Sequence, residues 1–370
     1  MTEQFYKVDA GKLKELMQDV FKGLGVPAGE AELCADVLIE ADLKGIDSHG
    51  VARLKQKYYD AIKDGIQYPQ TEIEVVSDRG ATAVFDGGFG MGMVIAHRAM
   101  QTAIDKAAEF GIGMTTVRNS THYGIAGYYA RMATDQDMIG VTGTNARPAV
   151  APTFGVENMM GTNPLTFGIP SDEEFPFLID CATSLVQRGK VETYDRLGKE
   201  LPEGWVIGED GEAKTDPGQI LKDLVAGSAA LAPLGGIGEE SGGHKGYGYA
   251  ATVEILSAAL SGANFLKALS DVKEGKPAKQ NLGHFFIAID VSFFRPLEEV
   301  KKTTGDILRS LRNSKKAPGE ERIYTAGEKE YLARQKRSEE GIPLTEVTRK
   351  ELQVMIEELG LSEKWRNFLP

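Results

Sequence analysis

The sequence is poor in the residue types that cross-link small folds or hold metal ions. Its 370 residues include two cysteines and five histidines. Cys34 and Cys181 could form at most one bridge, and no two histidines stand close together in the sequence, so neither a disulfide scaffold nor a metal site is predicted. Each cysteine lies in an apolar stretch, and we therefore expect two buried free thiols in a reducing, cytoplasmic compartment.

An excess of positive charge and long hydrophobic runs are also missing. The 42 lysines and arginines are outnumbered by 54 aspartates and glutamates, which gives a formal net charge of −12 at pH 7. Nucleic-acid binding needs clustered cations opposite the phosphates, so no nucleic-acid partner is expected. No segment reaches the roughly 20 apolar residues of a membrane span, and the charged N-terminal stretch does not resemble a signal peptide. A membrane partner is not expected either.

The chain does contain helical patterns at both ends, with strands and helices alternating between them. Helices are predicted near the ends at 12–24, 28–43, 48–62, 297–313, 326–338 and 349–359. Strands are predicted between them at 72–76, 82–85, 112–117, 139–144, 165–169, 177–179 and 284–290. The intervening helices are predicted at 92–110, 125–134 and 249–260. We expect an α/β domain, 71–294, inserted into a mostly helical domain that both chain ends form, 1–70 and 295–370.

The segment Asp47–Arg53, DSHGVAR, is the first that could carry chemistry. His49 and Arg53 are four residues apart, so on a helix they share one face, with Leu54 and Tyr58 packing on the roughly opposite face. An arginine can hold a carboxylate through two parallel hydrogen bonds, and a histidine beside it could protonate a neighbouring oxygen. The same spacing is also typical of a solvated helix face.

The segment Asn119–Gly124, NSTHYG, places another histidine between a predicted strand and a predicted helix. Ser120 or Thr121 could cap that helix, and His122 would then lie at its positive end, where an imidazolium ion is disfavoured. A neutral imidazole is what a base needs to take a proton from a hydroxyl group. A histidine in an ordinary polar loop is the alternative interpretation.

Two further segments could contact a ligand. Asp180 follows a predicted strand, where a carboxylate could orient a histidine, meet a ribose or cap a helix. The Gly-rich segment Gly242–Gly248, GGHKGYG, is interpreted as a loop that opens a helix. Its backbone N–H groups and Lys245 could approach phosphate oxygens, whereas a flexible loop with a solvated lysine is the alternative.

Standard nucleotide-binding fingerprints are incomplete. Gly88, Gly90 and Gly92 follow a predicted strand, but Met93 stands where the third glycine of a Rossmann fingerprint belongs. No phosphate-loop motif ending in Gly-Lys-Ser or Gly-Lys-Thr occurs, so NTP hydrolysis is not supported.

Together the motifs resemble those of the malate/L-lactate dehydrogenase type 2 family, which also contains sulfolactate and ureidoglycolate dehydrogenases and cyclic imino-acid reductases. The resemblance covers nearly the whole chain. It rests on seven ordered motifs: DSHGVARL (47–54), NSTHYGIAGYYA (119–130), TNARPAVAP (144–152), GTNP (161–164), DCATSLVQRGKV (180–191), GGHKGYG (242–248) and PGEE (318–321).

The resemblance implies a non-Rossmann, mixed-sheet NAD(P)-binding domain and a homodimer. It implies acid/base roles for His122 and His49, supported by Asp180. The substrate contacts that it implies are Ser48, Arg53, Asn145 and Arg147. Among these, Arg53 is the carboxylate clamp, and Arg147 is a second cation that would favour a dicarboxylate such as malate. The cofactor contacts that it implies are Asp180, Cys181, Ala182, His244, Lys245, Gly246, Pro318, Gly319 and Glu320.

We therefore expect an oxidoreductase that uses NAD or NADP to transfer a hydride to or from a small 2-hydroxy/2-oxo acid. Malate and lactate are the leading substrates, and ureidoglycolate, sulfolactate and cyclic imino acids remain open. The alternative from another class is a hydrolase or lyase that uses the His/Asp set without a redox cofactor. The Gly-rich segment with Lys245 argues against that alternative.

Overall fold

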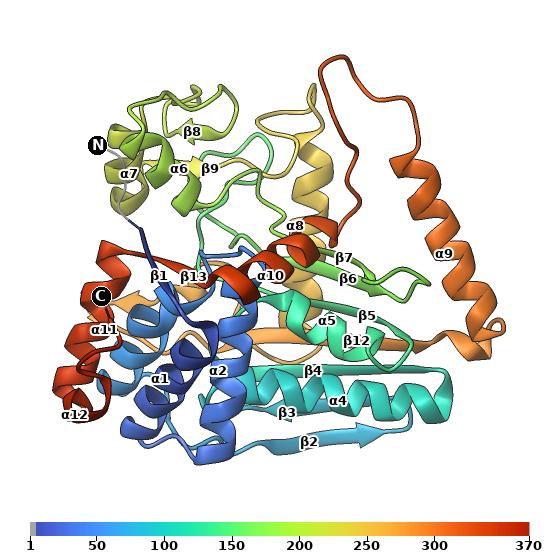
Figure 1. Ribbon diagram of the computed structural model, residues 1–370. Helices are drawn as coiled ribbons and strands as arrows, with labels where there is room; N and C mark the ends of the chain where they lie inside the picture. The colour runs from blue at the N-terminus through green and yellow to red at the C-terminus, as the bar shows by residue number, and fades with distance from the viewer. Residues whose placement is uncertain (1–4, 370) are drawn as a thin grey trace.

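A seven-stranded mixed sheet forms the centre of the computed structural model, which describes residues 5–369 (Figure 1). The strands are β2 (Glu74–Arg79), β3 (Thr82–Asp86), β4 (Ile112–Ser120), β5 (Met138–Thr144), β6 (Leu165–Ile169), β7 (Phe177–Cys181) and β12 (Leu282–Asp290). Their order across the sheet is β2-β3-β4-β12-β5-β6-β7, and β3 with β4 is the one parallel pair among these described strands. The prediction of an α/β fold with a mixed sheet is confirmed.

Helices cover both faces of this sheet. One face carries α4 (Gly92–Phe110) and α5 (Ala126–Thr134), whose apolar side chains pack with Phe286 and Ala288 of β12. The opposite face carries α8 (Gly243–Ala258), which approaches β12 so closely that a Cβ at Gly283 would meet its backbone. Successive residues of a strand point to opposite faces, so β12 contacts both helical layers and is apolar from Phe285 to Ile289.

The two ends of the chain share one hydrophobic core, and β1 pairs with β13 beside it. The elements at the two ends are β1 (Phe5–Val8), α1 (Ala10–Gly23), α2 (Ala28–Leu43), α10 (Glu328–Glu340), β13 (Ile342–Thr345), α11 (Glu346–Glu358) and α12 (Ser362–Trp365). Buried members of the core include Leu13, Leu16, Met17, Leu38, Tyr58, Leu352, Met355 and Trp365. Met91 and Met93 at the start of α4 join the same core, so the end segments and the sheet region share one packed core at this point.

A smaller unit lies over one end of the sheet and is visible at the top of Figure 1. It consists of α6 (Arg188–Arg196), β8 (Val206–Gly208), α7 (Pro217–Ala226) and β9 (Ala229–Leu231). Its own apolar cluster includes Val206, Ile220 and Leu231 and extends to Ala250 of α8. The remaining short elements are η1 (Val51–Arg53), η2 (Leu54–Tyr59), α3 (Asp60–Lys63), η3 (Leu266–Leu269), β10 (Val272–Lys273), β11 (Lys276–Pro277) and η4 (Val291–Phe293).

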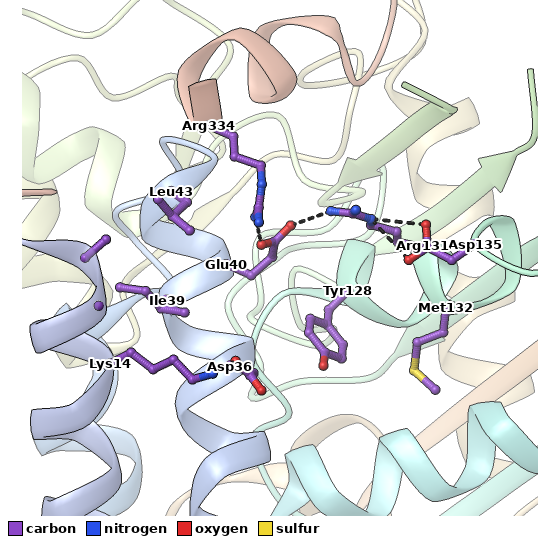
Figure 2. A pocket seen from close by; sticks show the side chains of 12 residues that line it. Lys14, Asp36, Ile39, Glu40, Leu43, Tyr128, Arg131, Met132, Asp135 and Arg334 are labelled. Carbon is purple, nitrogen blue, oxygen red and sulfur yellow. Dashed lines mark hydrogen bonds and ion pairs between the residues drawn. The ribbon is translucent and has the colours of Figure 1, made fainter. Parts of the chain in front are cut away.

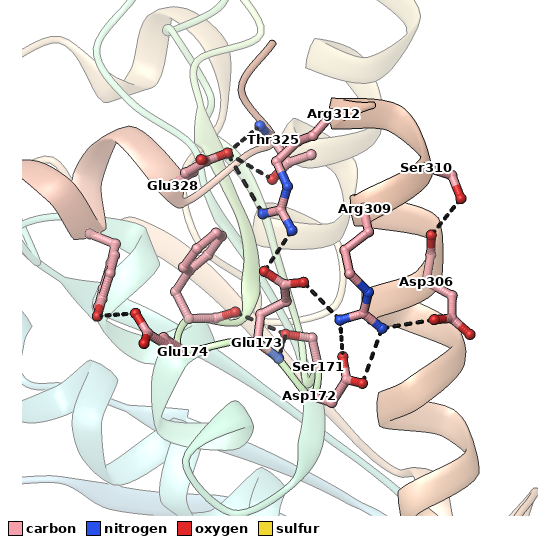
Figure 3. A network of polar contacts seen from close by, with 12 residues as sticks. Ser171, Asp172, Glu173, Glu174, Asp306, Arg309, Ser310, Arg312, Thr325 and Glu328 are labelled. Carbon is pink, nitrogen blue, oxygen red and sulfur yellow. Dashed lines mark hydrogen bonds and ion pairs between the residues drawn. The ribbon is translucent and has the colours of Figure 1, made fainter. Parts of the chain in front are cut away.

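The last long helix before the C-terminal elements, α9 (Leu297–Arg312), lies on the side of the molecule opposite α11 (Figure 1). An ion-pair network ties it to the turn between β6 and β7 (Figure 3). Arg309 contacts Asp172 at 2.9 Å and Glu173 at 2.8 Å, and Arg312 contacts Glu173 at 2.6 Å. Arg312 also lies 3.8 Å from Glu328 of α10, so both ends of the exposed connection 313–327 are anchored.

Among residues 5–369, no helix combines the length and the apolar character that crossing a bilayer requires.

Replacing Glu173 with glutamine should loosen the attachment of α9. The Glu173 side chain is 14% exposed and its nearest partner, Arg312, is 16% exposed, so the neutral variant leaves an enclosed guanidinium group without its closest counter-charge. We expect Glu173→Gln to lower the free energy of unfolding by about 1–2 kcal/mol in urea denaturation. Glu174→Gln is the matched control, because Glu174 contacts only the exposed hydroxyl of Tyr331 among the described residues. Equal losses in the two variants would contradict this role of the network.

Candidate functional site

A buried carboxyl group holds the segment Asp47–Arg53 from the inside. Asp42, near the end of α2, is 2% exposed and accepts a hydrogen bond from the backbone N–H of Val51 at 2.8 Å. Burial raises the pKa of Asp42 to about 8. A Cβ at Gly50 would lie 1.9 Å from Asp42 Oδ1, so only glycine fits where the chain passes this carboxyl group.

The same segment is held from the outside by α10. Arg337 donates to the backbone carbonyl of Asp42 at 2.6 Å and pairs with the carboxylate of Asp47. The turn that carries His49 is therefore fixed between a buried acid of α2 and a basic side chain of α10.

The helix predicted from Asp47 or Ser48 to Ile62 is wrong in its first half. It begins only at Val51, and the 3-10 turn η1 and the six-residue π-helix η2 precede α3. Neither Asp47 nor Ser48 caps it, because Asp42 accepts the Val51 N–H and Asp47 turns to Arg337. In a π-helix, i→i+5 hydrogen bonding brings residues four and five apart to one side. The predicted packing of Leu54 and Tyr58 is confirmed, since both are fully buried, but the prediction missed that the Tyr58 hydroxyl reaches His122.

The structure brings His49 and His122 together. Their ring centroids are 5.9 Å apart and the ring planes differ by 20°. Ser48 Oγ lies 2.9 Å from His49 Nδ1, and Tyr58 Oη lies 2.7 Å from His122 Nδ1, which also accepts the Gly124 N–H at 3.3 Å. A hydroxyl group can donate or accept, so Tyr58 remains bound to Nδ1 in either tautomer of His122. No described residue hydrogen bonds to His122 Nε2.

Burial and neighbouring cations keep both histidines neutral. Burial is the main cause that lowers the pKa of His49 to about 4, and the charges of Arg53 and Lys57 lower it further. Burial also lowers the pKa of His122 well below its usual range, with His49, Lys57 and Arg53 adding to the effect. Both rings are therefore neutral at pH 7, which is the state that a base requires.

Basic side chains surround the histidine pair. Arg53 donates from Nε to the carbonyl oxygen of Ser48 at 2.6 Å, while its Nη1 reaches Gln56 only at 3.4 Å, so the outer edge of the guanidinium group is loosely held. Arg147 pairs with Asp271 at 3.2 Å and is 51% exposed. Burial is the main cause that lowers the pKa of Lys57. The charge of Asp271 opposes this effect, and the charges of Arg147 and Arg53 add to it.

The expected capping role of Ser120 or Thr121 at the helix after His122 is wrong. α5 begins at Ala126 without a side-chain cap, whereas Thr121 Oγ1 accepts the N–H of Gly92 at 2.9 Å, in the first turn of α4. Burial and cations, rather than a helix terminus, account for the neutral state of His122.

His284 of β12 belongs to this region and was not predicted. It is fully buried, with Nδ1 2.7 Å from Thr144 Oγ1 and Nε2 2.7 Å from Ser120 Oγ. Its ring stacks on Tyr123 with centroids 4.5 Å apart, so it holds the segment that carries His122 from both sides. The signal in the sequence was a lone histidine in an otherwise apolar strand.

The polar side chains of two predicted site residues form hydrogen bonds with other parts of the protein. Asn145 is buried, donates to the carbonyl oxygen of Asn264 at 2.8 Å and accepts the Gly283 N–H at 2.9 Å. Asp180 accepts the N–H of Gly127 at 2.6 Å and the hydroxyl of Thr166 at 3.0 Å, and burial raises its pKa. Within residues 5–369 it makes no hydrogen bond to a histidine.

The thiols differ from the expectation. Cys34 is buried as predicted, but Cys181 is exposed, so that half of the prediction is wrong. The physical reason is position, because β7 is an edge strand and its side chains Ile179 and Cys181 point to an open face. Burial of its surroundings nevertheless raises the pKa of the Cys181 thiol. Ala182 follows it and is half-buried.

The Gly-rich segment forms the first turns of α8, so the predicted loop and the helix start at Tyr249 are wrong. A Cβ at Gly243 would lie 2.0 Å from Gly236 O, and one at Gly246 would lie 2.1 Å from Leu234 O. These glycines thus admit a neighbouring turn of the protein itself. His244 and Lys245 are exposed in the first turn of α8.

Two of the three predicted cofactor segments lie side by side. The N–H of Leu234, in the turn that packs on Gly246, bonds to Thr183 O at 2.8 Å, which joins the start of α8 to the chain just after Asp180. The third segment, Pro318–Glu320, lies in the exposed connection between α9 and α10, which projects from the molecule in Figure 1. The structure does not bring that segment to the other two.

A cavity of about 450 Å³ lies elsewhere, among α1, α2, α5 and α10 (Figure 2). Its charged groups pair with one another, as Glu40 contacts Arg131 at 2.9 Å and Lys14 contacts Asp36 at 2.5 Å. It is lined by none of the predicted site residues. The histidine pair with its cations is therefore the candidate active site.

Similarity to known proteins points to the same chemistry. The sequence profile described as malate/L-lactate dehydrogenase matches residues 8–353. A malate dehydrogenase of Pyrococcus horikoshii is 42% identical over 97% of each chain. An L-sulfolactate dehydrogenase of Methanocaldococcus jannaschii is 38% identical over 94% of this chain and 96% of its own.

The fold agrees with these relatives. The crystal structure of malate dehydrogenase from Entamoeba histolytica matches with a TM-score of 0.92 and 46% identity, covering 96% of this chain and 99% of that one. The predicted family and the prediction of an oxidoreductase, rather than a hydrolase or lyase, are confirmed. The chain belongs to the malate/L-lactate dehydrogenase family.

Proposed function

We propose that the protein transfers a hydride between NAD or NADP and a small 2-hydroxy/2-oxo acid, with malate as the first candidate substrate. The observation that carries this proposal is the neutral His49/His122 pair beside Arg53. The relatives of P. horikoshii and E. histolytica are malate dehydrogenases, which supports malate. Sulfolactate, lactate and ureidoglycolate are the alternatives that other relatives suggest.

We propose one task for each of these side chains. Arg53 binds the substrate carboxylate through the outer edge of its guanidinium group and so presents the adjacent carbon. In the direction of oxidation, Nε2 of neutral His122 takes the hydroxyl proton. This step uses the tautomer with the proton on Nδ1, which donates to Tyr58 Oη in place of accepting the 3.3 Å contact from the Gly124 N–H. In the direction of reduction, the same Nε2 returns the proton to the oxygen. His49 stacks beside His122 and is proposed as a second acid/base group of the site.

The donor groups near the start of α8 fit the phosphates of a dinucleotide. His244 and Lys245 stand exposed in the first turn of α8, at the positive end of the helix, where an anion is favoured. Asp180, Cys181 and Ala182 would line the adjoining part. When bound, the nicotinamide ring supplies the acceptor or donor of the hydride.

The domain organisation and the remaining ligand contacts are also proposed. We propose that residues 71–294 form the NAD(P)-binding domain, in a non-Rossmann arrangement, between helical parts 1–70 and 295–370. Arg147 and Ser48 are proposed as further substrate contacts, and Pro318–Glu320 as a cofactor contact that requires movement or a second subunit of a homodimer. A cytoplasmic location fits the free thiols.

A substrate panel tests the proposed function. The purified protein should consume NADH or NADPH when given oxaloacetate, and more slowly with pyruvate or 3-sulfopyruvate, followed by absorbance of the reduced nicotinamide. Comparison of the two cofactors identifies the preferred one. Absence of acid-dependent oxidation with every 2-oxo acid and both cofactors would refute the proposal.

His122→Ala should lower turnover by roughly 10²- to 10⁴-fold, because it removes the group that moves the proton. Binding of the reduced cofactor, measured by its fluorescence, should remain nearly unchanged. His97→Ala on α4 is the matched control and should retain turnover, since His97 contacts none of the site residues within the described chain. Normal turnover in His122→Ala would reject the assignment.

The pH profile of oxidation should lack a histidine step near the ordinary value. Because the pKa of His49 is about 4 and that of His122 is also lowered, both rings stay neutral as the pH falls through about 6.5. We expect kcat/KM for oxidation to stay level down to roughly pH 5.5 and to fall only as the pH approaches the lowered values. Circular dichroism at each pH checks the fold. A loss of activity centred near the ordinary histidine value would contradict this description.

A further inference from the structure

Lys57 is an enclosed cation without a counter-ion. It lies half-buried in the π-helix η2, and within residues 5–369 its ammonium group makes no ion pair or hydrogen bond. Burial is the largest cause of its lowered pKa, and repulsion from Arg147 and Arg53 adds to it. Lys55, two residues earlier, shows the ordinary situation, since it pairs with Asp60 at 2.7 Å. Enclosed lysines are normally paired, so Lys57 lacks an anion.

Lys57 stands on the helical run that serves the histidine pair. It follows Arg53 by four residues and precedes Tyr58, whose hydroxyl lies 2.7 Å from His122 Nδ1. Its charge adds to the lowering of the pKa of both His49 and His122, after the larger effect of burial. Asp271 is the carboxylate whose charge reaches Lys57, but Asp271 is already paired with Arg147 at 3.2 Å. The site therefore holds one carboxylate-binding arginine and, one helical turn further on, a second positive charge that the protein does not neutralise.

We propose that Lys57 binds a second acidic group of the substrate and thereby selects 2-hydroxy acids with two anionic groups over monocarboxylic acids. The inference rests on the proposed function. Arg53 holds the carboxylate next to the reacting carbon, and Lys57 holds the distal carboxylate or sulfonate. Arg147, to which the sequence had given this second-cation role, is half exposed and paired, so it contributes less.

The discrimination arises because a monocarboxylic acid provides no acidic group to pair with the Lys57 ammonium group. A diacid satisfies both Arg53 and Lys57 as it displaces water from them. A monoacid of similar size covers Lys57 without giving it a partner, and an enclosed charge without a partner is costly. A site built to bind a polar group rejects an analogue that lacks the group more strongly than one missing methylene would explain.

The test compares Lys57→Met with Lys55→Met in steady-state reduction of oxaloacetate and pyruvate. Methionine keeps the length and apolar stem of lysine but removes the charge. We expect Lys57→Met to lower kcat/KM for oxaloacetate by about 10- to 100-fold, mainly through KM, and to leave pyruvate unchanged or improved. Lys55→Met should behave as the unmodified protein with both acids.

Two further measurements separate charge from fold. Lys57→Arg keeps the charge and should retain most of the preference for oxaloacetate. Succinate, a diacid that does not react, should raise the melting temperature of the unmodified protein and not that of Lys57→Met, while propionate should affect neither. The effect of succinate on the melting temperature tests the role of Lys57 independently of catalysis. If no 2-oxo acid is reduced, the proposed function is refuted, but the succinate result still tests whether Lys57 binds a second acidic group. An equal loss for both oxo acids, or no change for either, would overturn the inference.

Discussion

The carboxyl group of Asp42 lies under the candidate active site, and the backbone N–H of Val51 donates to it at 2.8 Å. This contact fixes where the chain leaves α2 and where η1 begins, and it leaves room at position 50 for glycine alone. Everything that η1 and η2 present to the site follows from that anchor. Arg53, Lys57 and Tyr58 are displayed by one continuous helical run whose start Asp42 sets.

A second constraint comes from the sheet. His122 follows β4, and His284 of the neighbouring strand β12 holds Ser120 just before it. His49 thus comes from the segment between α2 and η1, and His122 comes from the end of a strand of the sheet. The centroids of these two rings are 5.9 Å apart. Burial, with several positive charges nearby, keeps both rings neutral. A neutral ring whose Nε2 has no hydrogen-bond partner among the described residues is suited to moving a proton. The proton chemistry therefore depends on the docking of two regions far apart in sequence.

The site is locally basic in a chain with a formal net charge of −12. Local cations with few acidic neighbours attract small anions whatever the global charge, because the field near the site is set by the nearest groups. Arg53 ends η1 and Lys57 lies in η2, four residues further along the chain, and this spacing is compatible with a substrate that carries acidic groups at two positions. The π-helix is what allows Tyr58 to join them, since its wider turn brings a fifth residue to the same side.

The sequence by itself determined the family, the α/β class and most helices and strands, because apolar periodicity and ordered motifs are local properties of the chain. The helix 28–43 was predicted with its observed bounds. His49, His122 and Arg53 were singled out by their chemistry, and the resemblance to the family gave them their roles. The π-helix, the contact of Tyr58 with His122, the burial of His284 and the unpaired state of Lys57 were decided only by tertiary structure. Tertiary structure also decided the role of Gly243 and Gly246. The sequence predicted that they belong to a phosphate-binding loop, whereas in the structure they leave room for the neighbouring turn that contains Leu234 and Gly236. The reason is that the periodicity of apolar residues reveals which face of a helix or strand is buried. Which residues that face contacts depends on the order of the strands and on the packing of distant segments across the core.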